Sequence, residues 1–128
     1  MRSRSPAVAA AVLLLSVSTS HAVTWTSANK WLDLVVPKSR FNCVTVLPIR
    51  TGYAFHRISL IPGGKDSDLY LYGYNGSWAY IAASANGGVV PDTVIFNAST
   101  RSTYNSIMAC VWGFGGASQF DLYYAVGN

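Results

Sequence analysis

The chain has 128 residues, which suits one domain and leaves no room for a second of typical size. Hydrophobic residues make up 51% of it and aromatic residues 13%, whereas charged residues make up only 11%, with a formal net charge of +4. This composition excludes a disordered chain, because the apolar side chains are numerous enough to offset the entropy lost on folding. The acidic residues are all aspartate, and the many glycines and tyrosines favour strands and turns over long helices.

Residues 1–22 have the pattern of a secretory signal peptide. Arg2 and Arg4 precede an apolar stretch at residues 7–17, and small residues follow it. The stretch is shorter than the roughly 20 residues that a membrane-spanning helix needs, and no later segment is a better candidate. We therefore expect the signal peptide to be removed and residues 23–128 to form one secreted or periplasmic domain with no membrane span.

The positive net charge does not indicate nucleic-acid binding. Two of the nine basic residues, Arg2 and Arg4, belong to the expected signal peptide. The other lysines and arginines are scattered singly and form no basic run. We expect no nucleic-acid partner.

The two cysteines, Cys43 and Cys110, are separated by most of the domain. An even pair in an exported protein predicts a disulfide. A reactive thiol or a metal site is the alternative, and both are disfavoured because there is no CxxC spacing and only one histidine, His56, follows the signal peptide.

Apolar and polar residues alternate with a period of two along nearly the whole domain, and turn residues separate the alternating runs. The pattern predicts an all-β protein, an antiparallel β-sandwich of jelly-roll type with about eight strands. The pair Asn75-Gly76 predicts a type I′ hairpin turn, because both residues tolerate a positive φ. The expected strands are residues 31–36, 41–47, 53–61, 68–74, 78–84, 93–98, 107–114 and 120–126.

The same alternation predicts which side chains share a face of the sheet. Leu69 and Leu71 should enter the core, with Asp68, Tyr70 and Tyr72 on the opposite side. Three further groups should each share one face: Phe41 with Cys43 and Thr45, Met108 with Cys110, Trp112 and Phe114, and Phe120 with Leu122 and Tyr124.

Residues 64–73, which read GKDSDLYLYG, and residues 109–122, which read ACVWGFGGASQFDL, carry a resemblance to a known family. Together they resemble the bacterial pre-peptidase C-terminal domain, in which a strand precedes a G-D-x-D-L-Y-like segment and a later strand ends in a glycine-containing turn. The resemblance covers most of residues 31–126, with Lys65 and the two cysteines as departures from the family pattern. It implies a jelly-roll accessory domain of a secreted protease.

Asp66 and Asp68 follow a pair of glycines and are the candidate metal ligands. Two carboxylates so close together in an acid-poor chain can supply oxygen ligands to Ca²⁺. The alternative, which we favour, is that Asp66 accepts backbone N–H bonds in the turn before the strand. We therefore expect no required cofactor, with Ca²⁺ as the one candidate.

A catalytic site is not expected, because no nucleophile elbow or zinc-binding motif is present and His56 stands alone in a predicted strand. We interpret His56 as a surface or structural residue and the protein as a non-enzyme.

Aromatic side chains are the best evidence for function, because tyrosine and tryptophan provide large contact areas at low entropic cost. We expect an accessory or binding module that recognises an extracellular polypeptide or matrix surface through exposed aromatics. The alternatives are a carbohydrate-binding, lectin-like module and a small secreted inhibitor or effector. The candidate binding residues are Tyr70, Tyr72, Tyr74 and Trp78 around the hairpin, with Tyr123, and its neighbour Tyr124, on the last strand.

Overall fold

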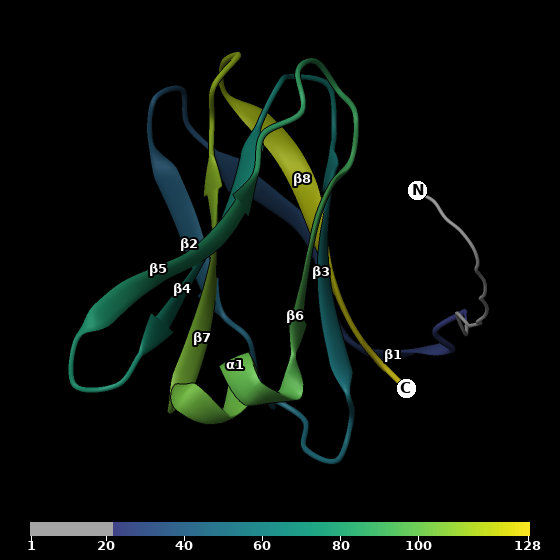
Figure 1. Ribbon diagram of the computed structural model, residues 1–128. Coiled ribbons are helices and arrows are strands. Elements are labelled where there is room, and N and C mark those ends of the chain that lie inside the picture. Colours follow the sequence, from purple (N-terminus) through teal and green to yellow (C-terminus); the bar gives the residue numbers. More distant parts are fainter. Residues whose placement is uncertain (1–21) are drawn as a thin grey trace, which may run out of the picture.

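Eight strands and one short helix make up residues 22–128, the part of the chain that this computed structural model describes (Figure 1). The expected signal peptide, apart from Ala22, lies outside the described residues. In chain order the elements are β1 (Trp25–Val36), β2 (Phe41–Thr45), β3 (Phe55–Pro62), β4 (Asp68–Tyr74), β5 (Trp78–Ser84), β6 (Asp92–Asn97), α1 (Ala98–Thr103), β7 (Ser106–Trp112) and β8 (Ser118–Gly127).

The strands form two four-stranded sheets, with orders β1-β8-β3-β6 and β2-β7-β4-β5, and every pairing between strands is antiparallel. Only β4 and β5 are consecutive strands within one sheet, whereas each other connection crosses from one sheet to the other. The expected antiparallel β-sandwich of jelly-roll type is therefore confirmed. Figure 1 shows the two sheets facing each other, with the β4–β5 hairpin projecting at the lower left.

The core lies between the sheets and follows the predicted alternation. Leu69 and Leu71 of β4 are fully buried, as expected. On β8, Phe120, Leu122 and Tyr124 share the inner face, which confirms their predicted grouping. The other buried members of the core cluster are Val36, Val46, Ile58, Leu60, Val94, Phe96, Ile107, Ala109, Val111 and Val126.

Each predicted strand is present, and two features of the chain were not predicted. The strand β1 begins at Trp25, well before residue 31, and it pairs with β8 along most of its length. The helix α1 was missed; its N-cap is Asn97, whose side chain accepts a hydrogen bond from the amide of Thr100. No helix within residues 22–128 is long and apolar enough to cross a membrane.

The β4–β5 hairpin is present, but the predicted type I′ turn is wrong. Tyr74 pairs with Trp78, so the loop has three residues, 75–77, in place of two. Only Gly76 has a positive φ, at 86°, whereas a type I′ turn requires positive values at both of its central residues.

Candidate functional site

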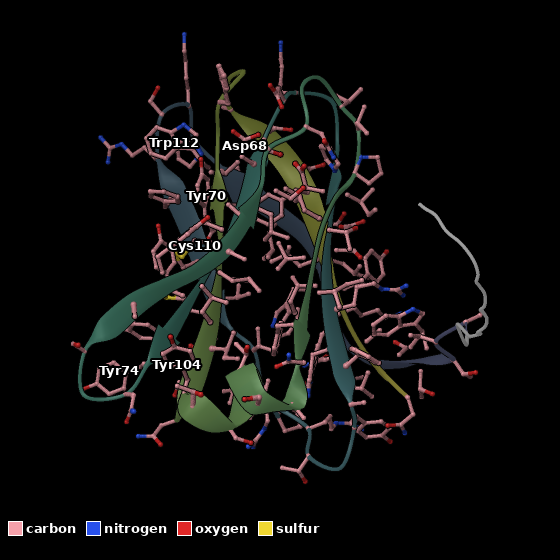
Figure 2. All side chains as sticks on the ribbon, viewed as in Figure 1. Asp68, Tyr70, Tyr74, Tyr104, Cys110 and Trp112 are labelled. Carbon is pink, nitrogen blue, oxygen red and sulfur yellow. A yellow bond between two sulfur atoms is a disulfide. The ribbon has the colours of Figure 1, made fainter. Side chains whose placement is uncertain are left out.

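The outer face of the β2-β7-β4-β5 sheet, which points away from the core, is covered by aromatic side chains. The core side chains of β4 and β7 are at alternate positions, so the residues between them point outward. Figure 2 shows Tyr70, Trp112 and Tyr74 along this sheet, with Tyr74 near the end of the β4–β5 hairpin. We call this surface the aromatic face and define it by Phe41, Tyr70, Tyr72, Tyr74, Trp78, Tyr80 and Trp112.

At one end of the aromatic face, three rings from three strands contact one another. Phe41 of β2 lies opposite Trp112 of β7, with ring centroids 4.7 Å apart. The Phe41 and Tyr70 rings form a T-shaped pair, with centroids 5.7 Å apart. These contacts restrain the rings before any partner arrives.

At the other end, the rings are paired across β4 and β5. Tyr72 and Tyr80 are 6.1 Å apart in an edge-on arrangement, and Tyr74 and Trp78 are 5.1 Å apart beside the hairpin loop. A register shift between Leu71 and Tyr72 brings Tyr72 opposite Tyr80. The aromatic face therefore extends across the sheet to the end of the hairpin.

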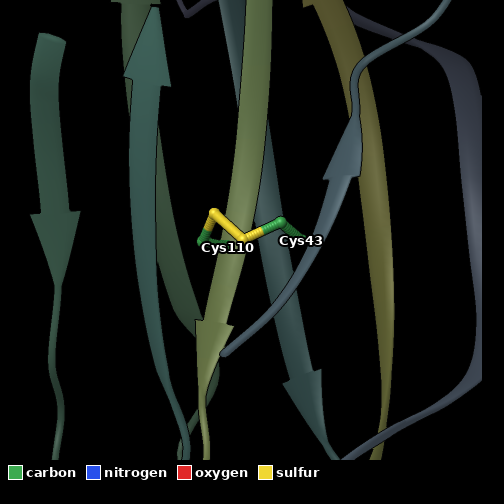
Figure 3. The surroundings of a disulfide bond; sticks show 2 residues. All are labelled: Cys43 and Cys110. Carbon is green, nitrogen blue, oxygen red and sulfur yellow. A yellow bond between two sulfur atoms is a disulfide. The ribbon is translucent and has the colours of Figure 1, made fainter. Parts of the chain in front are cut away.

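The disulfide lies in the middle of the aromatic face, and its prediction is confirmed. Cys43 and Cys110 are opposite each other in the β2–β7 register and are bonded (Figure 3). Tyr70 lies opposite Cys110 on the other side of β7, and Cys110 is only 2% exposed. The covalent link between β2 and β7 fixes the strand that holds Phe41 next to those that hold Trp112 and Tyr70.

Solvent reaches the aromatic face unevenly. Tyr80 is 61% exposed and Trp78 is 48% exposed, whereas Tyr70 and Tyr72 are half-buried between their neighbours. Burial first, and then the nearby Asp68 carboxylate, raise the pKa of the Tyr70 hydroxyl, which therefore stays protonated and able to donate at neutral pH.

Sequence reasoning placed four of the candidates correctly together and missed three members of the aromatic face. Tyr70, Tyr72, Tyr74 and Trp78 all lie on it. Tyr80 was missed although it is two residues from Trp78 and shares its side of the strand. The remaining members, Phe41 and Trp112, are joined to the group only by the pairing of distant strands.

The structure separates the two tyrosines of the last strand from the aromatic face. Tyr123 is 38% exposed and lies on the outer face of the other sheet. Tyr124 is fully buried in the core, where its hydroxyl lies 2.7 Å from Nδ1 of His56. His56 is itself fully buried, so it is a structural residue and not a surface one.

The candidate calcium residues lie where β3 connects to β4, at the edge of the core. Asp66 Oδ1 and Ser67 Oγ are buried and have no hydrogen-bond partner within residues 22–128. Burial, followed by repulsion from Asp66 and Asp92, raises the pKa of the Asp68 carboxyl. These oxygens are of the kind that Ca²⁺ prefers, yet within residues 22–128 no three aspartate, histidine or cysteine side chains lie close enough together to hold a metal ion.

Asp66 does not act as we predicted in the turn. Its backbone carbonyl accepts the amide of Gly115, whereas its side-chain Oδ1 has no partner among the described residues. The carboxylate that does organise a turn is Asp92, whose Oδ1 accepts bonds from Ser84 Oγ and the Asn86 amide, each at 2.8 Å.

No family model matches the chain, and a search of curated proteins finds no relative. The jelly-roll fold that the resemblance to the pre-peptidase C-terminal domain implied is present, and membership of that family stays a prediction.

Proposed function

We propose that this protein is an exported accessory module that binds an extracellular polypeptide or matrix surface through its aromatic face. The observation that supports this most directly is the gathering of tyrosine, tryptophan and phenylalanine rings on the outer side of one sheet, where they are not needed to fill the core. The resemblance to an accessory domain of secreted proteases supports the same role.

The composition of the aromatic face matches the centre of a protein interface. Such centres are enriched in aromatic residues and methionine and depleted of charged residues. Met108 lies opposite Tyr72 on the same face, and the one charged residue at an outward position, Asp68, is only 8% exposed. A partner therefore does not have to be charged, and it gains binding energy mainly by covering rings.

The disulfide and the ring contacts hold the aromatic face in a fixed arrangement. Binding costs less when side chains are ordered beforehand, because less rotamer entropy is lost. Trp78 and Tyr74 support each other at the end of the hairpin, and Phe41 is supported by Trp112. Exposed tryptophan and tyrosine in such positions are the residue types that dominate binding energy in measured interfaces.

A neutral polysaccharide is the second candidate ligand. The aromatic face has almost no charge and presents tyrosine hydroxyls, including that of Tyr70, which remains a donor at neutral pH. A catalytic role has less support, because His56 is fully buried and cannot reach a substrate.

Binding assays on immobilised collagen, gelatin and casein test the proposal, with insoluble cellulose and chitin as the polysaccharide arm. The test variant is the double substitution Tyr72→Ala and Trp78→Ala. The matched control is Phe55→Ala, because Phe55 is a partly exposed aromatic residue on the outer face of the opposite sheet. Melting temperatures of all the proteins are measured alongside.

We expect the double variant to lose binding to the polypeptides while it keeps its fold, and the control to bind as the wild type does. Equal binding by both variants, or no binding of the wild type to any polypeptide, would contradict the proposal. Binding to cellulose or chitin alone would overturn it in favour of the polysaccharide alternative.

A further inference from the structure

A hollow lies on the outer face of the β1-β8-β3-β6 sheet, on the opposite side of the sandwich from the aromatic face. Its volume is about 240 Å³, and Ala125 of β8 is part of its lining. Trp25 and Tyr123 also line it, together with Arg57 of β3. The volume is below the roughly 300–1,000 Å³ of sites that take drug-sized ligands, so the hollow suits a single small ring.

The small side chain of Ala125 on β8 leaves room for this hollow. The successive outward residues of β8 here are Tyr123, Ala125 and Gly127, so a large side chain is followed by two small residues. The space outside Gly127 is filled by residues 23–25, because a Cβ built there would lie 2.8 Å from the Thr24 carbonyl oxygen and 3.1 Å from Cε3 of the Trp25 indole. The indole and the Tyr123 ring thus lie about two outward positions apart along β8, roughly 13 Å, with the Ala125 position between them.

The Arg57 guanidinium is held in place without being neutralised. Its central carbon lies 4.5 Å from the centre of the Trp25 ring, a cation–π arrangement. Among residues 22–128 the guanidinium has no hydrogen-bonded or ion-paired partner. The nearest aspartate on β8 is Asp121, which is four residues from Ala125 and therefore about 13 Å further along the strand. The N–H donors of the Arg57 guanidinium are therefore available to a ligand.

Other polar groups around the hollow complement Arg57. Ser27 and Ser59 supply hydroxyls from the strands on either side of β8, and the Ser59 hydroxyl also lies 3.4 Å from that of Thr93 on β6. Lys30 lies opposite Tyr123 in the β1–β8 register and adds a second positive charge nearby. A ligand that satisfies all these groups has an anionic oxygen pair, several hydroxyls and an apolar ring face.

We propose that this hollow is a second binding site, specific for an acidic monosaccharide unit such as a uronic or sialic acid. The carboxylate receives paired hydrogen bonds from Arg57, for which the planar guanidinium is suited. The C–H face of the sugar packs on the Tyr123 ring, and the sugar hydroxyls bond to Ser27 and Ser59. Phosphate and acetate lack the ring, and neutral sugars lack the charge, so each satisfies only part of the site.

The test titrates galacturonic acid and N-acetylneuraminic acid into the protein and follows the NMR signals of the Trp25 indole and Arg57 guanidinium N–H groups. Glucose, N-acetylglucosamine, acetate and inorganic phosphate are titrated in parallel. Arg57→Gln removes the charge, and Arg57→Lys keeps the charge but loses the paired donors. Arg40→Gln is the matched control, because Arg40 is exposed and precedes β2 in the other sheet.

We expect an acidic sugar to shift both signals, and the Kd to rise at least about tenfold in Arg57→Gln, as the loss of hydrogen bonds to a charged group predicts. Arg57→Lys should bind with intermediate affinity and Arg40→Gln as the wild type does. Binding of neutral sugars or acetate as tight as that of the acidic sugars would overturn the proposal, and so would the absence of any shift. The variant Tyr72→Ala/Trp78→Ala should bind the sugar normally, so failure of one site does not imply failure of the other.

Discussion

Nδ1 of His56 lies 2.7 Å from the hydroxyl of Tyr124, and both side chains are completely buried between the sheets. The His56 ring also stacks on Phe96 at 4.9 Å, while its Nε2 has no partner among the described residues. The Tyr124 hydroxyl accepts a further hydrogen bond from the backbone amide of Arg50. A single hydroxyl thus joins β3, β8 and the connection that follows β2.

Protonation of His56 should destabilise the fold. Burial, and then the positive charge of Arg101, lower the pKa of His56 below its ordinary value of 6.5. The unfolded chain therefore takes up a proton at a higher pH than the folded chain. The contribution of neutral His56 to the free energy of unfolding is fully present above pH 6.5. It falls as the pH drops below 6.5, by at most about 1.4 kcal/mol per pH unit. Urea unfolding at pH 8, 6 and 5 measures this, with His56→Gln as the variant that cannot titrate. An identical decline in both proteins would exclude His56 as its source.

Removal of the Tyr124 hydroxyl tests the buried hydrogen bonds directly. Tyr124→Phe leaves the Arg50 amide and His56 Nδ1 without their partner, and we expect a loss of about 1–3 kcal/mol in the free energy of unfolding. Tyr123→Phe is the matched control, because it removes a hydroxyl from the adjacent, exposed residue. Chemical denaturation of the two variants should separate them, and equal stabilities would contradict the assigned network.

The period of two in the sequence was sufficient to predict the strands and several of their faces. Between Asp68 and Tyr74 the alternation identifies both the strand and its buried leucines, because one face packs on the core and the other does not. The start of β1 was missed because residues 26–30 are mostly small or polar and show no clean alternation. That segment is a strand because β8 supplies its hydrogen-bonding partner, which is a tertiary effect.

The complete aromatic face could be predicted only with knowledge of which distant strands pair. The sequence grouped Phe41 with Cys43, and separately Trp112 with Cys110. In an antiparallel pair joined by that disulfide, the residue two before one cysteine lies opposite the residue two after the other, so Phe41 and Trp112 must meet. The last strand did carry a signal, because Tyr124 alternates with Phe120 and Leu122, whereas Tyr123 shares its side with Gln119 and Asp121.

Loss of the disulfide should cost a large part of the stability. The bond joins residues 67 apart in sequence, and the chain-entropy model gives about 4 kcal/mol for a loop of this length. We expect the double variant Cys43→Ala/Cys110→Ala to be less stable by an amount of this order in urea or guanidinium unfolding. Reduction of the wild type should produce a similar loss, and a negligible change in both experiments would show that the cross-link does not constrain the unfolded chain.

Asp68→Asn should stabilise the protein at neutral pH. Burial, and repulsion by Asp66 and Asp92, raise the pKa of Asp68, so its charged form is disfavoured in the folded state. A raised folded pKa means that the wild type gains stability as the pH falls through it, so the advantage of the variant should shrink towards pH 4. Unfolding free energies at pH 7 and pH 4 measure the effect, with the exposed Asp33→Asn as control. An advantage that does not change with pH would contradict the stated cause.

The same pair of proteins tests the calcium hypothesis. Binding through Asp66 and Asp68 predicts that millimolar Ca²⁺ raises the melting temperature of the wild type and that Asp68→Asn abolishes the rise. An unchanged melting temperature of the wild type would remove Ca²⁺ from consideration.

The contact between Gly73 and Tyr104 closes the sandwich near α1. Gly73 occupies an inward position of β4 and is buried, and a Cβ built on it would overlap the ring of Tyr104. Figure 2 shows Tyr104 beside the end of α1, so the ring covers the core where that connection crosses between the sheets. Gly73→Ala therefore forces the ring outward, and overpacking of this kind costs typically about 1–3 kcal/mol.

Gly87→Ala is the matched control for this substitution, because nothing lies within 4 Å of a Cβ at Gly87 and the residue does not have a positive φ. We expect Gly73→Ala to lower the melting temperature clearly and Gly87→Ala to leave it unchanged or slightly raised, since alanine reduces the entropy of the unfolded chain. Combining Gly73→Ala with Tyr104→Ala should cost less than the sum of the two single changes, because the ring that causes the overlap is gone. Additive effects of the two changes would show that the methyl group is accommodated without displacing Tyr104.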